Sequence, residues 1–526
     1  MSEPEVTKIV TVAEMQALEK AADAAGHSYA TMMEIAGRGV AEQIIDQSAG
    51  MPVAKRQVLV LVATGNNGGD GLVIARLLHQ YGYHIKTHVL NCGSKRSEAF
   101  LTNYERLKEL GVWPEVISCV SELPAVSEND IVIDAIFGLG LTRAPEGIIK
   151  EVIQFINNSN AYILSIDFPS GMFADKPVLD KESVVRSNYT LTFQTPKLPF
   201  LLPENQAYSA LWEVLDIGLD REYLDQVKTN YYIQYKEDIL PLYRMRQRFS
   251  HKGDFGHALI LGGSFGKIGA TVLASRAALT IGSGLVTAYI PKCGYQILQT
   301  AIPEVMVEVD GEHELEYFNF EVKPNAIAIG PGMGTAAKTS EGLYTFLKKN
   351  KQPLVIDADA INILSANKDW YKLVPKDSVL TPHPKEFERL AGTWKNDFDK
   401  LDRLLALSEK YQWVIVLKGA FTAIAYRGIL YFNSTGNPAL ATAGSGDVLT
   451  GIITGLIAQG YKPVEAAQMG VYLHGSAADL AMDQQVYETF TASDCIAGLS
   501  AAFIDLFSKE APEVEPEENE EAPDKK

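Results

Sequence analysis

The chain contains 526 residues, and its 65 acidic and 47 basic side chains give a formal net charge of −18 at pH 7. Apolar residues make up 47% and charged residues 21%, a composition typical of globular proteins with large cores, and the length indicates more than one domain. The acidic balance argues against a protein that binds nucleic acid or an anionic membrane surface.

Signals for secretion, membrane insertion and disulfide formation are missing from the sequence. The first residues, MSEPEVTKIVTVAEM, lack the basic and apolar regions of a secretory signal, and no apolar run reaches the ~18 residues of a spanning helix. The four cysteines lie far apart without a CxxC motif, which argues against a disulfide framework or a zinc cluster. We therefore expect a soluble, cytoplasmic protein with no membrane partner.

Short β-branched runs alternate with helical stretches along the first half of the chain. The runs cover residues 58–63, 85–90, 130–134, 162–167 and 189–193, and helices are expected at 71–80 and 99–110. Such alternation is typical of βαβ units around a parallel sheet. Because the runs are apolar throughout, the strands should be covered by helices on both faces.

The second half repeats this style without repeating the sequence. Strands are expected at residues 257–261, 285–290, 326–329, 354–357, 378–380 and 414–417, followed by a hairpin of 421–426 and 429–432. Three long helices are expected at 447–459, 464–482 and 492–507. Thr491 and Asp494 form a capping-box start for the last of them.

A polar, irregular stretch at residues 216–249 contains no clear strand and separates the two halves. We place the boundary near residue 225, which predicts one α/β domain at residues 1–225 and a second at 226–510. Residues 511–526 are expected to be a disordered acidic tail, because residues 510–526 hold eight acids, two lysines and three prolines.

A glycine-rich loop, TGNNGGDG at residues 64–71, joins the first strand to its helix. Such a loop lets backbone N–H groups approach an anion at the helix N-terminus, although a plain βα turn is the simpler reading. The loop matches neither G-x-G-x-x-G nor the Walker A motif. Its two asparagines and its aspartate favour a binding site over a plain turn.

Two further strands of the first half end in acidic residues. Asp134 precedes the loop FGLGLTR, and Asp167 precedes Pro169-Ser170-Gly171. Ligands of open parallel sheets bind beyond the carboxyl ends of the strands. An acid at one such end can simply cap a helix, but the convergence of Asn67, Asp134, Asp167 and Ser170 predicts a site. Oxygen ligands without Cys or His suit a hard cation.

The motifs TGNNGGDG, DAIFGLGL and SIDFPSGM, in this order and spacing, resemble the NAD(P)H-hydrate epimerase family over essentially the whole first domain. The resemblance implies a Rossmann-like fold and the interconversion of R- and S-NADHX and of R- and S-NADPHX, which carry a hydroxyl at nicotinamide C6. It implies a potassium ion at Asn67, Asp134 and Ser170, and Asp167 as a catalytic and substrate-binding residue beside the nicotinamide. The remaining substrate-binding residues that it implies are Asn66, Asn67, Gly68, Gly69, Asp70, Gly138, Leu139, Gly140, Leu141, Thr142, Arg143 and Ala144.

Two positions depart from the family pattern. Val62, Ala63 and Thr64 stand where Cys-Gly-Pro is frequent, and Leu139 stands where Thr is common. Neither change removes an implied ligand, but both bear on how the loops pack.

Three glycine-rich segments mark the second half. GGSFGKIGA at residues 262–270 and GPGMG at 330–334 each follow a strand and permit close backbone approach to a ligand. The third, ATAGSGDV at residues 441–448, opens an apolar helix whose first N–H groups can hold a phosphoryl group. Asp447 can take a proton from a hydroxyl that attacks phosphorus, or it can simply cap the helix.

Two other polar residues stand at strand ends of the second half. Lys418, in KGAFT, can offer a cation to a nucleotide phosphate, although an isolated lysine at a strand end is usually solvated. His383 is held between Pro382 and Pro384, where a lone histidine is more often structural.

The motifs KGDFGHALILGGS, GPGMG, TPHPKEFERL, KGAFT and NPALATAGSGDVLTGIITGLIAQG resemble the NAD(P)H-hydrate dehydratase family over residues 243–507. The G-x-G-D arrangement resembles the ribokinase-like superfamily, so the resemblance implies a ribokinase-like α/β sandwich. It implies a nucleotide at Lys418, Gly419, Ala420, Phe421, Thr422 and Gly446. It implies the S-hydrate at Ala270, Gly332, Gly334, His383 and Asp447, with Asp447 catalytic. Lys385 departs from the glycine common in the family and bears on the loop around His383.

The order of the two domains resembles the bifunctional NAD(P)H-hydrate repair enzymes of bacteria, which join an isomerase and a lyase in one chain. The resemblance implies that the first domain epimerises the hydrates, and that the second dehydrates the S epimer to NAD(P)H at the expense of ADP or ATP. It implies a magnesium ion in the second domain, NADHX, NADPHX and the nucleotide as small-molecule partners, and a homo-oligomer. The alternative is a ribokinase-like kinase of a vitamin-type alcohol with a nucleotide-binding regulatory first domain.

Overall fold

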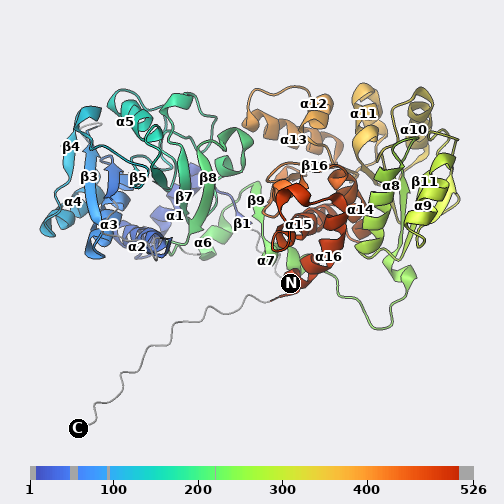
Figure 1. The fold of residues 1–526 in the computed structure, drawn as a ribbon, viewed down its shortest axis with the longest axis horizontal. Coiled ribbons are helices and arrows are strands. Elements are labelled where there is room, and N and C mark those ends of the chain that lie inside the picture. The colour runs from blue at the N-terminus through green and yellow to red at the C-terminus, as the bar shows by residue number, and fades with distance from the viewer. Residues whose placement is uncertain (1–6, 48–56, 92–94, 220, 509–526) are drawn as a thin grey trace, which may run out of the picture.

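Two β-sheets, each covered by helices on both faces, organise the part of the chain that the structure describes (Figure 1). This computed structural model describes residues 7–47, 57–91, 95–219 and 221–508. The expected disordered tail at 511–526 lies outside these residues. The sheets lie side by side along the long axis of the molecule, and the expected α/β class is confirmed.

The first sheet has seven strands, and all of its neighbouring pairs are parallel. In spatial order the strands are β4 (Glu115–Ile117), β3 (His84–Leu90), β2 (Gln57–Val62), β5 (Ile131–Ala135), β6 (Tyr162–Ile166), β7 (Ser187–Phe193) and β8 (Ser209–Leu215). The order therefore reverses at β2, with β3 on one side and β5 on the other. This is the Rossmann-like arrangement, whose ligand crevice lies at that reversal.

Alternate side chains of β2 show how the first sheet is buried. Val58, Val60 and Val62 pack with the apolar faces of one group of helices, and Leu59 and Leu61 pack on the opposite face against α5 (Ile148–Asn157). The first group comprises α1 (Val12–Ala24), α2 (Tyr29–Gln47), α3 (Asn66–Gln80) and α4 (Glu98–Glu109). A strand with both faces buried reads as a continuous apolar run, which is why the sequence reveals it.

The second sheet has eleven strands with a parallel centre and a mixed edge. Its order is β1 (Thr7–Lys8), β9 (Tyr231–Gln234), β18 (Ile429–Asn433), β17 (Ala423–Tyr426), β16 (Val414–Leu417), β15 (Val379–Leu380), β14 (Leu354–Ile356), β13 (Ala326–Ile329), β10 (His257–Leu261), β11 (Leu285–Ile290) and β12 (Met306–Val309). Strands β16, β17 and β18 pair antiparallel, as the predicted hairpin requires.

Helices cover both faces of the second sheet. One core contains α8 (Ile268–Thr280), α14 (Ser445–Ala458), α15 (Pro463–Ala481) and α16 (Ala492–Phe507), and the other contains α10 (Ala337–Lys349), α11 (Ala358–Ala366), α12 (Pro384–Ala391) and α13 (Asp397–Tyr411). The shorter helices are α6 (Arg221–Gln226), α7 (Lys236–Ile239) and α9 (Tyr295–Ala301). The predicted capping box of Thr491 and Asp494 begins α16.

One sequence expectation is wrong. Residues 216–249 were expected to hold no strand, yet β9 lies there, with β18 on one side and β1 on the other. The N-terminal residues Thr7 and Lys8 thus pair with β9 in the second sheet, and Ile9 is buried in the second core. Strands of two to four residues carry too few alternating positions for periodicity to reveal them.

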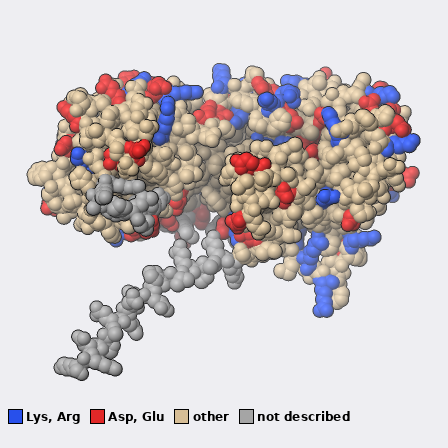
Figure 2. All heavy atoms as spheres, viewed as in Figure 1, with Lys and Arg blue, Asp and Glu red and all other residues tan. Residues whose placement is uncertain are grey.

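Direct contacts also join the two halves. The backbone N–H of Glu204 donates to Asp397 Oδ2 at 2.9 Å, and the N–H of Asp397 donates to Glu204 Oε2 at 3.0 Å. The rings of Trp212, on β8, and Phe421 lie with centroids 6.1 Å apart. On the face shown in Figure 2, acidic and basic side chains are interspersed over both halves. No helix among the described residues is long and apolar enough to cross a bilayer.

Gly68→Ala should destabilise the first half. A Cβ at Gly68 would lie 1.8 Å from the carbonyl oxygen of Ala63, so α3 must move away from β2 to accommodate it. Overpacking of this kind typically costs about 1–3 kcal/mol of the free energy of unfolding. Denaturant unfolding followed by circular dichroism measures the loss. Gly65→Ala is the control, because a Cβ there meets nothing within 4 Å, and equal stability of the two variants would contradict the prediction.

Candidate active sites

A cavity of about 760 Å³ lies at the carboxyl ends of β2, β5 and β6, where the strand order of the first sheet reverses. Its walls come from the loops after β2 and β5, from Asp167 after β6, and from helix α1 through Met15, Gln16 and Glu19. The N-terminus of α3 opens into it, with Gly65 as N-cap and no side chain of the described residues bonded to the first N–H groups. Those free N–H groups can receive an anion such as a pyrophosphate.

Asn67, Gly138 and Asp167 meet at one point of this first cavity. A Cβ built on Gly138 would lie 2.8 Å from Asp167 Oδ2 and 3.2 Å from Asn67 Oδ1, so only glycine leaves room there. Both polar atoms of the Asn67 side chain are buried without a hydrogen-bond partner among the described residues. Buried polar atoms without partners are rare in folded proteins, so the Asn67 amide is suited to a ligand or an ion.

Asp134 lies beneath this point with its side chain fully buried. Its carboxylate accepts hydrogen bonds from Ser170 Oγ at 2.5 Å, from the Ser170 N–H at 2.9 Å and from Ser165 Oγ at 2.9 Å. Burial raises the pKa of Asp134, and these hydrogen bonds oppose the rise. The network fixes the turn after β6 against the end of β5.

Asp167 is held in a left-handed backbone conformation, with φ of 63°. Its Oδ2 accepts from the Leu139 N–H at 2.9 Å, and its Oδ1 lies 3.5 Å from Thr192 Oγ1. The buried ammonium of Lys197 donates in turn to Thr192 Oγ1 at 3.2 Å. A non-glycine residue with positive φ costs free energy and marks a constrained position, here one that aims a carboxylate into the cavity.

Most residues predicted for the first site do line the cavity. They are Asn66, Asn67, Asp70, Gly138, Leu139, Gly140, Leu141, Thr142, Arg143, Ala144 and Asp167. Gly68 and Gly69 instead face the core, where added Cβ atoms would meet Ala63 and Met33. Sequence reasoning missed Glu19 and Lys197. Glu19 follows the buried Met15 by one helical turn, a signal that could have placed it near the core.

A second cavity, of about 720 Å³, lies where the loops after β14, β15, β16 and β18 meet the N-terminus of α14. Gly444 is the N-cap of α14 with φ of 87°, a value that favours glycine. Burial and then the charge of Asp357 raise the pKa of Asp447 to about 7, although Lys418 opposes the rise. Asp447 is therefore poised to exchange a proton near neutral pH.

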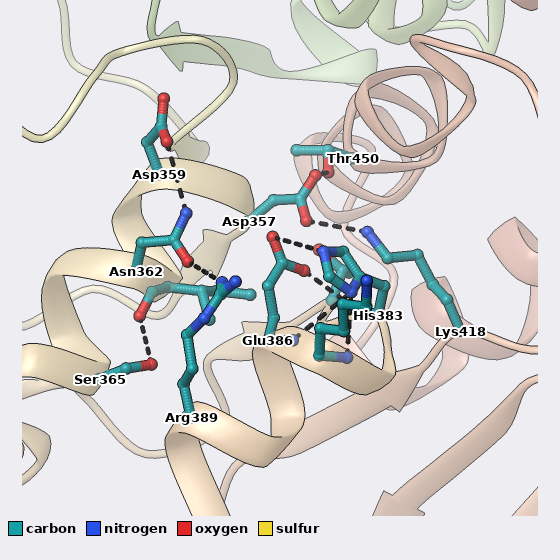
Figure 3. A network of polar contacts seen from close by, with 12 residues as sticks. Asp357, Asp359, Asn362, Ser365, His383, Glu386, Arg389, Lys418 and Thr450 are labelled. Atoms are coloured by element: carbon teal, nitrogen blue, oxygen red, sulfur yellow. Dashed lines mark hydrogen bonds and ion pairs between the residues drawn. The ribbon is translucent and has the colours of Figure 1, made fainter.

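Asp357 is the centre of the polar network in this second cavity (Figure 3). The Asp357 carboxylate accepts from Lys418 Nζ at 3.1 Å and from Thr450 Oγ1 at 2.7 Å. If Gly446 carried a Cβ, that atom would lie 3.1 Å from Lys418 Nζ, so the lysine points at the start of α14. Sequence reasoning counted Asp357 as the end of a strand and assigned it no role.

His383 caps α12 and also lines the second cavity. Its Nδ1 accepts from the backbone N–H of Lys385 at 3.1 Å, while the backbone N–H of His383 donates to Glu386 Oε2 at 2.9 Å. Lys385 contributes its N–H to this cap, so the lysine leaves the turn intact. Burial and the charge of Lys418 lower the pKa of His383, which favours the neutral ring.

Four other predicted residues lie outside the lining of the second cavity. Ala270, Gly332 and Gly334 form a cluster beside it. The Gly334 N–H donates to Asp359 Oδ2 at 2.9 Å, and a Cβ on Gly332 would lie 3.0 Å from the Ala270 Cβ. Phe421 contacts Trp212, whereas Lys418, Gly419, Ala420, Thr422 and Gly446 do line the cavity.

Comparisons with known proteins match both halves. One family model, described as YjeF-related protein N-terminus, matches residues 29–198, and another, described as NAD(P)H-hydrate dehydratase, matches residues 258–499. The bifunctional NAD(P)H-hydrate repair enzyme Nnr of Moorella thermoacetica is 35% identical over 505 residues, covering 93% of this chain and 95% of that protein. The Escherichia coli Nnr is 33% identical over 441 residues, 81% of each chain.

The chain belongs to the family of bifunctional NAD(P)H-hydrate repair enzymes. This confirms the family that the motifs indicated. A solved structure, the ADP/ATP-dependent NAD(P)H-hydrate dehydratase of Bacillus subtilis co-crystallised with ATP and Mg²⁺, is 30% identical over 52% of this chain and 97% of that one, with a TM-score of 0.46. We call the first cavity the epimerase cavity and the second the dehydratase cavity, after the two activities of the family.

Dehydration of the hydrate should rise with pH through about 7. Only the carboxylate form of Asp447 can accept a proton, and its pKa of about 7 makes that form scarce at lower pH. The rate with saturating nucleotide, measured between pH 5.5 and 8.5 by the absorbance of NADH, should show this acidic limb. A rate that does not change across this range would contradict the role of Asp447 as the base.

Proposed function

We propose that residues 1–225 epimerise R- and S-NAD(P)HX, and that residues 226–510 dehydrate S-NAD(P)HX to NAD(P)H at the expense of ADP or ATP. The observation that carries the proposal is the pairing of Asp447 with the N-terminus of α14 in the dehydratase cavity. A proton acceptor beside a phosphate-binding helix end is the arrangement that phosphoryl transfer to a hydroxyl requires.

The dehydration proceeds by activating a poor leaving group. Asp447 takes the proton of the C6 hydroxyl as that oxygen attacks the terminal phosphorus of the nucleotide. The phosphate then leaves C6 as the ring loses a proton from C5, which restores the dihydronicotinamide. A kinase-type site thus yields a lyase product, with one nucleotide consumed for each NAD(P)H recovered.

Lys418 and the first N–H groups of α14, including that of Gly446, are proposed to hold the transferring phosphate. Residues 419, 420 and 422 line the same cavity beside them. Mg²⁺ commonly uses only one or two protein carboxylates together with phosphate oxygens and water. Glu386 lines the cavity and can supply such a carboxylate, and the ion would neutralise charge on the phosphates. We propose ADP as the donor, through resemblance to fused bacterial members of the family.

Potassium is proposed at Asn67, Asp134 and Ser170, of which Asn67 lines the epimerase cavity while Asp134 and Ser170 are buried outside its lining. The residues fit such an ion, because the Asn67 amide oxygen is buried without a hydrogen-bond partner among the described residues. The side chains of Asp134 and Ser170 also offer only oxygen atoms as ligands. A bound cation would offset the negative charge of the dinucleotide and of the buried Asp134. Asp167 is proposed to exchange the proton at the reacting centre, because it is fixed beside this point.

A cytoplasmic location and a homo-oligomer complete the proposal. Cys119, Cys293 and Cys495, three of the four cysteines, are free thiols, which supports a reducing compartment. The homo-oligomer stays a prediction that gel filtration with light scattering tests.

Pure protein incubated with R,S-NADHX and ADP or ATP should return NADH from both epimers. Absorbance at the NADH band follows recovery, and chromatography of the nucleotide shows its consumption. Accumulation of a stable phosphorylated alcohol in place of NADH would instead indicate the vitamin-type kinase. Epimerisation without nucleotide excludes a first half that only regulates.

Asp447→Asn should abolish dehydration while leaving epimerisation intact. Asn occupies the same volume, and the fold should persist, but it cannot accept the C6 hydroxyl proton, so the rate should fall by roughly 10²-fold or more. Chromatography of the NADHX epimers measures epimerisation in the same sample. Dehydration at more than about a tenth of the normal rate would assign the base elsewhere.

Replacing potassium by a bulky organic cation should slow epimerisation and leave dehydration of S-NADHX unchanged. Asn67→Ala should weaken the response to potassium, because it removes the unpartnered amide without touching the buried Asp134 network. Initial epimerisation rates over a potassium titration provide the measurement. An Asn67→Ala enzyme with the normal potassium dependence would rule out this site.

A further inference from the structure

Glu19 places a second carboxyl in the epimerase cavity. It lies on α1, whose start is fixed by the capping box of Thr11 and Glu14, and whose Met15 and Leu18 are buried. These contacts hold the helix against the sheet and bring Glu19 to the cavity wall. Asp167 reaches the same cavity from a different element, the turn after β6.

The two carboxyls differ in how they are held. Asp167 accepts hydrogen bonds from the backbone N–H of Leu139 and from the hydroxyl of Thr192. The Thr192 hydroxyl in turn accepts from the ammonium of Lys197. No hydrogen bond joins Glu19 to another residue within the part of the chain that the structure describes. One carboxyl is thus fixed by the protein, and the other is free to bond a substrate.

Several carboxyl groups lie close together in the epimerase cavity, and their mutual repulsion favours the protonated form of at least one of them. Glu19, Asp70 and Asp167 all line it, whereas Lys197 is buried behind Asp167 and donates to the carbonyl oxygens of Phe193 and Thr195. Burial, and then the charge of Asp167, raise the pKa of Glu19 to about 7. Burial, followed by the charges of Asp167 and Glu19, also raises the pKa of Asp70 well above its usual range. With a pKa of about 7, Glu19 can both give and take a proton near neutral pH.

We propose that Glu19 is a second catalytic residue of the epimerase cavity and transfers a proton on the face of nicotinamide C6 that Asp167 does not serve. The inference rests on the proposed epimerase function. Epimerisation at C6 exchanges the hydroxyl between two faces of one carbon, and a single fixed carboxylate serves only one of them. The free carboxyl of Glu19, on a separate wall, serves the other.

The proposed reaction balances in protons and electrons. The C6–O bond breaks as the lone pair of N1 forms an N1=C6 double bond, and protonated Glu19 gives its proton to the departing hydroxyl, which leaves as water. Water then adds to the opposite face of C6, the electrons of the double bond return to N1, and Asp167 takes the proton that the added water loses. The reverse direction uses Asp167 as the acid and Glu19 as the base, and solvent restores the starting protonation.

Glu19→Gln tests the proposal in the full-length chain. The amide keeps the shape but cannot transfer the proton, so epimerisation of purified R-NADHX without nucleotide should fall by about 10²-fold or more. Dehydration of S-NADHX with ADP should stay normal, which also reports that the chain is folded. Asp23→Asn is the matched control, because it makes the same change at an exposed residue of the same helix. Epimerisation by Glu19→Gln within threefold of the normal rate would overturn the proposal.

Chemical rescue separates proton transfer from a structural role. Glu19→Ala opens space at the cavity wall, and added formate can supply the missing carboxyl. Formate should increase the epimerisation rate of Glu19→Ala at least tenfold and leave the normal chain unaffected. A slow Glu19→Ala enzyme that formate does not accelerate would assign Glu19 a structural role and overturn the proposal. If the unmodified chain itself fails to epimerise R-NADHX, the proposed function fails instead.

Discussion

A buried carboxylate at the end of a central strand, satisfied by hydrogen bonds, organises each half of this protein. Asp134 ends β5 and binds Ser165 and Ser170, which ties the turn carrying Asp167 to the sheet. Asp357 follows β14 and binds Lys418 and Thr450, which aims the lysine at the start of α14. Removing a partner from such a carboxylate leaves a buried group unsatisfied, at a typical cost of about 1–3 kcal/mol or more. The positions of Asp167 and of Lys418 therefore each depend on a buried carboxylate.

The family joins two activities in one chain, and the two cavities of this chain have no lining residue in common. The chemistry explains why they are fused: dehydration consumes only the S epimer, and the epimerase half converts the R epimer to it. Contacts such as the reciprocal hydrogen bonds of Glu204 and Asp397 fix the halves against each other. Phe421 shows how closely the halves approach, because it belongs to the predicted nucleotide loop but packs against Trp212 of the first sheet.

The sequence predicts a strand well where the strand is buried on both faces along its whole length, and poorly elsewhere. Strands β10, β11, β13 and β16 match their predicted bounds, since residues buried on both faces form uninterrupted apolar runs. Strand β8, at the edge of the first sheet, and β9, next to the edge of the second, were missed, because partly exposed strands mix polar and apolar residues. Glycines 138 and 444 stand where close approach or positive φ demands glycine, so the motifs predicted these loops correctly. Asp357, Glu19 and Lys197 were missed because their roles arise from burial and from partners distant in the chain, which no local spacing reveals.

The pairing of β1 with β9 sets an order of events for the newly made chain. Thr7 and Lys8 leave the ribosome more than 200 residues before their partners Tyr232 and Ile233. Contacts of such wide sequence separation form late, because closing a long loop is entropically costly. The sheet of the first half can assemble during synthesis, while the N-terminal strand waits for the second half to emerge. A cut between the halves at residue 225 would leave β1 and β9 as unpaired strand edges on separate fragments, and such edges promote association between molecules.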